Sequence, residues 1–218
     1  MWFLIPILAL ELLAAIAGTL YIRKRPTTKP SIRYLVYFLW LTVFVEHVFG
    51  LMPSYIKYIP QLEHLKDGFL STNVWAYNIY IVISGVFYIY FIEQQIHIQW
   101  IKQFLRILTS LSICICGTCL IKTGSFFVQL QSFPNLCNTL FVLIAATLLL
   151  YDHIMTDEII PILDIRISVG IGIFVFHFLK ILLILYRYTD LVAVDFYYII
   201  RSLLSVACLF LYLSLIHI

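Results

Sequence analysis

The sequence predicts an all-helical membrane protein, a polytopic bundle of about seven transmembrane spans in a single domain covering residues 1–218. Of its 218 residues, 63% are hydrophobic and only 11% are charged, whereas a soluble domain is about half apolar and about a quarter charged. A soluble domain of this length could not cover so much apolar surface, so the excess is expected to face lipid. The apolar residues also come in runs of about 20, the length that a helix needs to cross a bilayer and about twice that of a barrel strand.

The seven apolar runs are separated by segments that carry proline and polar residues. The predicted spans cover about residues 2–22, 33–52, 74–94, 104–122, 134–152, 165–186 and 195–217. The prolines at or between them are Pro26, Pro30, Pro53, Pro60, Pro134 and Pro161. Because proline disrupts a helix interior, these positions favour span ends. The boundary between the fourth and fifth spans is the softest, since it begins with only Lys122-Thr123-Gly124-Ser125.

The first run could be mistaken for a signal peptide, because Ala15-Ile16-Ala17 looks like a cleavage site. No positively charged region precedes it, however, and Glu11 lies inside it. The basic cluster follows the run instead, so we expect an uncleaved first span.

The basic residues of the loops predict the orientation of the bundle. One side of the membrane receives Arg23, Lys24, Arg25, Lys29, Arg33, Lys102, Arg106 and Arg166, and the other receives Lys57, Lys66, Lys122 and Arg187. The positive-inside rule then places the N-terminus outside and the C-terminus in the cytoplasm. The longest loop, 53–73, would lie outside, where residues 62–70 are expected to form a short interfacial helix.

Five ionisable residues inside the spans form the candidate site, because such residues are costly in a membrane and mark functional sites. They are Glu11, Glu46, His177, Lys180 and Arg201. At a rise of about 1.5 Å per residue, three of them lie about 9 Å below the outer surface, and Glu11 and His177 lie about 13 Å below it. The cluster therefore occupies two adjacent layers in the outer half of the bundle.

Two interpretations of this cluster remain open. The unlike charges can simply pair and fix the packing of the helices, and we predict that Glu46 contacts Lys180 or Arg201. Alternatively, the cluster lines a pocket that opens outward and binds a ligand, an ion or a proton. Protonation of His177 would then change the activity between about pH 5 and 8.

Further polar side chains lie at similar depths. Asn78 and Asn138 could line the same cavity, although hydrogen bonding between helices is the simpler role for them. A stripe of polar side chains at helical spacing is expected to face the bundle interior, where its hydroxyls find partners; it comprises Tyr77, Tyr80, Ser84 and Tyr88. Ala14 and Gly18 form a small-xxx-small pair, which predicts a close helix contact around the first span.

Neither cysteines nor acidic residues predict a metal site or a cofactor. Cys114, Cys116 and Cys119 share one apolar helix without a second pair of zinc ligands, and we interpret them as small apolar residues. A bridge from Cys119 to Cys137 is the weaker alternative. Four residues at the cytoplasmic end of the fifth span could hold a metal, although a solvated charged loop is the simpler interpretation; they are Asp152, His153, Asp157 and Glu158.

The segment Tyr77-Asn78-Ile79-Tyr80 opens an aromatic span, and acids lie in the first two spans at Glu11 and Glu46. This arrangement resembles a group of small, uncharacterised bacterial seven-helix membrane proteins over about the first 95 residues. The resemblance implies a multi-pass protein of the bacterial cytoplasmic (inner) membrane, and it implies no activity. Sugar facilitators share the size and topology, but they carry Pro-Gln pairs in their helices. Here the pair Pro60-Gln61 lies in a loop.

Three classes of function follow. The first is a non-enzymatic module that senses or conducts through the polar cluster, with the lipid bilayer as its surroundings and an unidentified small ligand or ion. The second is a homo-oligomeric pore-forming effector, for example an antiviral accessory of CRISPR loci, some of which are of this size. The third is an intramembrane enzyme acting on lipid, which is disfavoured because no nucleophile elbow, phosphate loop or HExxH motif is present. Nucleic-acid binding is not expected, because the basic residues are scattered.

Overall fold

The computed structural model describes residues 4–122, 126–127, 129–156, 165–189, 203–204 and 206–207. Within these ranges the chain is all-helical and contains no strand. Its seven α-helices are α1 Leu4–Lys24, α2 Pro30–Phe44, α3 Met52–Tyr58, α4 Val74–Glu93, α5 Gln99–Lys122, α6 Ser132–Met155 and α7 Ile165–Thr189. A π-helix, η1 (Val45–Gly50), joins α2 to α3, and two 3₁₀ turns follow, η2 (Pro60–Leu65) and η3 (Phe69–Ser71).

Six helical segments of the described chain are long and apolar enough to cross a membrane, which makes this a membrane protein. They are Pro6–Lys24, Pro30–Tyr58, Val74–Glu93, Gln99–Cys119, Ser132–Met155 and Ile167–Leu185. These correspond to the first six predicted spans. The seventh predicted span, 195–217, lies almost entirely outside the described residues.

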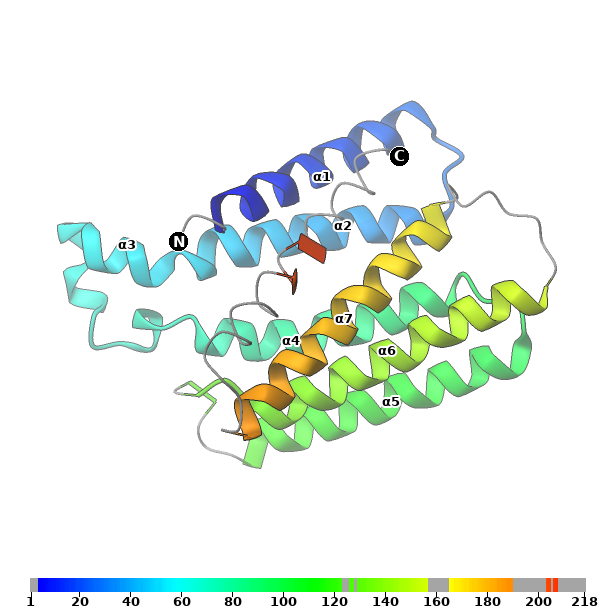
Figure 1. Ribbon diagram of the computed structural model, residues 1–218. Helices are drawn as coiled ribbons and strands as arrows, with labels where there is room; N and C mark the ends of the chain where they lie inside the picture. Colours follow the sequence, from blue (N-terminus) through cyan, green and yellow to red (C-terminus); the bar gives the residue numbers. More distant parts are fainter. Residues whose placement is uncertain are drawn as a thin grey trace.

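The second span is longer than predicted, because Pro53 does not end it. Pro53 lies in the first turn of α3, where the missing N–H has no helical partner to lose. The helix therefore runs on to Tyr58, and its end protrudes beyond the other helices (Figure 1). The interfacial helix expected at 62–70 is also wrong in form. The chain there makes the two 3₁₀ turns, with an extended Gly68 between them.

The helices form two groups. In the first group α1 packs on α2, as the pair Ala14 and Gly18 predicted: Ala14 is fully buried, and a Cβ on Gly18 would lie 2.6 Å from Cγ2 of Val36. In the second group α4 packs on α5 and α6, and α7 packs on α6 (Figure 1). Contacts from α2 and η1 to α4 join the groups.

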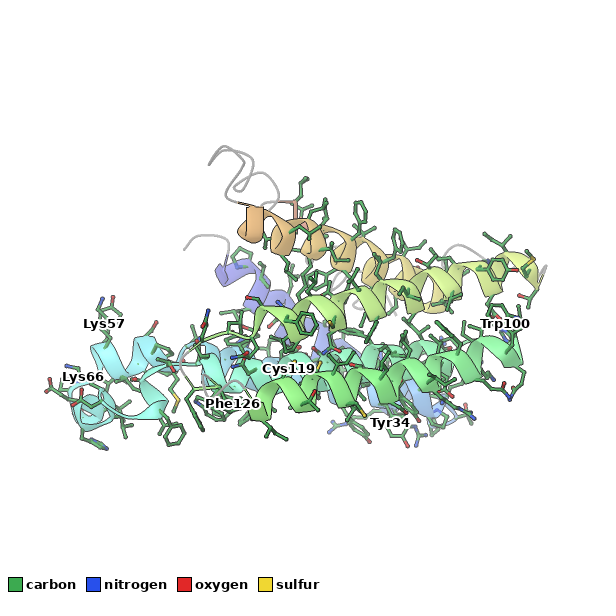
Figure 2. The ribbon with its side chains drawn as sticks, turned by 90° about the horizontal axis from the view of Figure 1, so that it is seen from below. Tyr34, Lys57, Lys66, Trp100, Cys119 and Phe126 are labelled. Atoms are coloured by element: carbon green, nitrogen blue, oxygen red, sulfur yellow. The ribbon has the colours of Figure 1, made fainter. Side chains whose placement is uncertain are left out.

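The apolar core lies toward the end of the bundle where α4 turns into α5. It contains the fully buried side chains of Ile89, Ile92, Ile101 and Leu105, packed against Ala145 of α6. Trp100 marks this end, and Lys57 and Lys66 mark the opposite, protruding end (Figure 2). The half of the bundle nearer to α3 is built differently, and it carries the candidate site.

Candidate functional site

A cavity of about 530 Å³ lies between the two helix groups in the half nearer to α3. Four of the five ionisable residues of the predicted cluster line it: Glu11 from α1, Glu46 from η1, and His177 and Lys180 from α7. The fifth, Arg201, lies outside the described residues. The rise of about 1.5 Å per residue along each predicted span was enough to predict that these four groups lie at similar heights in the bundle.

The α4 wall of the cavity is the predicted polar stripe. Tyr77, Tyr80, Ser84 and Tyr88 all line the cavity, because spacings of three and four residues keep side chains on one helix face. The Tyr80 hydroxyl lies 2.8 Å from Oγ1 of Thr42 in α2, which links the two helix groups across the cavity wall. Ser84 is half-buried, and its hydroxyl donates to the carbonyl of Ile81 at 3.1 Å.

The π-helix η1 carries Glu46 and aims it at the cavity. Each hydrogen-bonded turn of a π-helix contains one residue more than a turn of an α-helix, so the side chains that follow are rotated to another face. Such turns are frequent at functional sites. The Tyr77 hydroxyl donates to Oε2 of Glu46 at 2.5 Å. Gly50 leaves the room for this pair, since a Cβ there would lie 2.9 Å from the Tyr77 oxygen and 3.2 Å from Oε2 of Glu46.

The predicted ion pair between Glu46 and Lys180 is not formed. Within the described residues no ion pair joins the two side chains, and Glu46 is held by Tyr77 instead. The alternative partner, Arg201, lies outside those residues. The polar stripe predicted that Tyr77 faces the interior, but its pairing with Glu46 was not predicted, because apolar-run lengths give the depth of a residue and not the direction in which it points.

The basic side of the cavity belongs to α7. His177 is buried, and its Nδ1 donates to the carbonyl of Ile173 at 2.9 Å, which leaves Nε2 as the acceptor of the neutral ring. Its ring packs edge-on against Tyr88, with centroids 5.3 Å apart. Lys180 lies one turn further along the same face, and no described carboxylate lies within 4.0 Å of its Nζ.

Asn78 and Asn138 are not among the residues that line the cavity in the described structure. They form hydrogen bonds with neighbouring segments of the chain instead. Asn78 donates to the carbonyls of Phe126 and Gln129, at 2.8 and 3.1 Å, and accepts from the N–H of Gln131. It therefore anchors the connection between α5 and α6. Asn138 donates to the carbonyl of Ile81 at 2.6 Å and accepts a hydrogen bond from Ser112, which ties α4, α5 and α6 together.

Three polar residues of the cavity were not recognised from the sequence: Thr42, Asn73 and Asn135. One of them had a usable signal. Thr42 precedes Glu46 by four residues, a spacing that brings side chains to one helix face. Asn135 precedes Asn138 by three, but this spacing would have misled, since Asn138 does not line the cavity. Asn73 is the N-cap residue of α4, a position at which asparagine is common whether or not a site is present.

Asp152 is not part of a solvated loop, as the charge pattern suggested. Its side chain is buried, with 1% of the residue exposed, and it accepts hydrogen bonds from the backbone N–H groups of His97 and Ile98 at 2.8 to 3.1 Å. It thereby holds the turn before α5. Asp157 and Glu158 lie outside the described residues, within which no group of three metal-binding side chains occurs. The four described cysteines form no disulfide.

Comparisons with known proteins give no family for the chain: no protein-family model, no curated protein and no solved structure matches it.

Proposed function

We propose that this protein is a membrane-embedded binding module that senses a small polar ligand entering the cavity. The observation that carries the proposal is the meeting of Glu11, Glu46, His177 and Lys180 around one hollow. Ionisable groups at membrane depth are retained where they face an internal cavity and serve a function. A volume of about 530 Å³ also falls within the range of pockets that hold small ligands.

Sensing fits the described residues better than conduction. A conducting path needs polar groups along the whole thickness of the membrane, as in channels. Here the half of the bundle beyond the cavity is packed with buried apolar side chains such as Ile92, Ile101 and Leu105. An enzyme is supported less well, because within the described part of the chain no hydrogen bond joins His177 to a serine or threonine of the lining.

The cavity half faces the outside in this proposal. The loop around Lys29, which carries the larger share of basic residues, lies at the other end of the helices and would face the cytoplasm. Single cysteines in a cysteine-free background test this orientation. A reagent that cannot cross the membrane should reach Leu65→Cys from outside and Thr28→Cys only from inside, and labelling of Thr28→Cys from outside would reverse the orientation.

Water access to the cavity tests the proposed function itself. Ser84→Cys places a thiol in the lining, whereas Ser112→Cys places one at a fully buried position of α5. Both replace a mid-helix serine, so they form a matched pair in a cysteine-free background. A hydrophilic thiol reagent should modify Ser84→Cys quickly and Ser112→Cys only after denaturation. Equal protection of both thiols would mean a sealed cluster with a structural role, and the proposal would fail.

A further inference from the structure

We infer that the ligand is zwitterionic, with an ammonium group and an anionic group separated by a short link. This inference rests on the proposed function and names the ligand class of the same cavity. The geometry points to it because the acidic and the basic side chains of the lining come from different elements. Both carboxylates, Glu11 and Glu46, come from the first helix group, and both basic side chains, His177 and Lys180, come from α7 of the second.

The acidic side suits an ammonium group. Glu46 accepts one hydrogen bond, from Tyr77, which leaves further acceptor positions on its two oxygens. No described cation lies within 4.0 Å of it, so a bound ammonium group would supply the counter-charge that a carboxylate needs at this depth. Tyr77 and Tyr80 also line the cavity, and aromatic rings near a bound ammonium group attract it.

The basic side suits an anionic group. Lys180 has three N–H donors and lines the cavity without a described carboxylate in reach. His177 lies one helical turn away and directs only Nε2 to a partner, because Nδ1 is bound to Ile173. An anion beside Lys180 would therefore be held mainly by this ammonium group, and His177 would add a donor when its ring is protonated.

A zwitterion satisfies both sides at once, whereas a ligand with one charge satisfies one side only. Two sources offer the required chemistry: a soluble amino acid, or a lipid headgroup such as phosphoethanolamine. Both carry an ammonium group a few bonds away from an anion.

Binding to the full-length protein in dodecyl maltoside, an uncharged detergent, tests this inference. The soluble probes are glycine, β-alanine, γ-aminobutyrate and ε-aminocaproate, each compared with the amine and the carboxylate of the same chain length. The lipid probes are phosphatidylethanolamine and phosphatidylglycerol. We expect thermal stabilisation by at least one ω-amino acid, or by phosphatidylethanolamine, at concentrations at which the singly charged counterparts have no effect. The responding probe identifies the source.

Matched variants assign the effect to the two sides. Glu46→Gln and Lys180→Met should each weaken binding by about tenfold or more, because each leaves one charge of the ligand unpaired. Glu63→Gln and Lys57→Met alter the same residue types in the protruding segment and should leave binding unchanged. Should a cavity variant fail to fold, the comparison of probes on the unaltered protein still decides.

The remaining outcomes separate this inference from the proposed function. If an amine alone binds as well as the zwitterion, or if no probe binds while Ser84→Cys is labelled from water, the zwitterion inference is overturned and the binding module stands. If Ser84→Cys is protected and no probe binds, both are overturned.

Discussion

The two halves of the bundle use the same helices for opposite purposes. Around Ile92 and Ala145 the helices are in full contact and the interior is apolar. Around Tyr80 the interior is instead a cavity with polar side chains from α1, η1, α4 and α7 in its lining. Helices in a membrane gain nothing from apolar burial as such, since lipid is equally apolar, so close packing and buried hydrogen bonds hold them together. The filled half can supply that stability, which leaves the hollow half free to bind.

Removal of the Asp152 carboxylate should have the largest effect on stability. Asp152→Ala leaves the N–H groups of His97 and Ile98, in the turn between α4 and α5, without their acceptor. We expect the free energy of unfolding to fall by about 3 kcal/mol, because hydrogen bonds to a charged acceptor are lost and two donors are left unsatisfied. Unfolding in detergent measures it, with His153→Ala as the neighbouring control. An equal loss in both variants would contradict a specific role for Asp152.

A methyl group at Gly85 should have the next largest effect. A Cβ there would lie 2.5 Å from Cγ of Asn138, which is itself held by Ile81 and Ser112 and cannot move away freely. Gly85→Ala should therefore cost about 2 kcal/mol through overpacking. Gly117→Ala is the matched control, because nothing lies within 4 Å of that position. It should be neutral, or stabilising by up to about 1 kcal/mol, since alanine favours a helix. The reverse ranking would mean that α4 and α6 do not pack as described.

Loss of the Tyr77 hydroxyl should have a smaller effect than either change. Tyr77→Phe removes the donor to Glu46, but water in the hollow half can replace it, so we expect a loss below about 1 kcal/mol. The comparison with Asp152→Ala in the same unfolding assay tests how the two halves differ. If Tyr77→Phe were as destabilising as Asp152→Ala, the cavity would be dry.

The sequence predicted the depth of the candidate residues better than their direction. Glu11, Glu46, His177 and Lys180 meet because depth depends only on the helical rise and on where each span begins. Direction depends on rotation about the helix axis, and a helix that is apolar nearly all round gives little signal for it. The sequence therefore did not reveal that Asn135 lines the cavity whereas Asn138, one turn away, donates to the backbone carbonyl of Ile81.

The segment that follows the second span offers the smallest effect and a third environment, in which the side chains are exposed. Glu63 and Lys66 form an exposed ion pair there, with N and O 2.7 Å apart, and the hydrogen bond from Lys66 lowers the pKa of Glu63 below its ordinary value of 4.5. A lowered pKa in the folded protein adds stability above the unfolded pKa, and this is lost as the pH falls through the folded pKa. Lys66→Met should therefore raise the pKa of Glu63 toward 4.5, as followed by NMR of its side-chain carboxyl carbon. Stability at neutral pH should hardly change, because exposed ion pairs are weak.

Lys57→Met is the control, since Lys57 contacts the Tyr58 ring and no described carboxylate. An equal shift in both variants would show that Glu63 responds to the overall charge of the segment rather than to its partner.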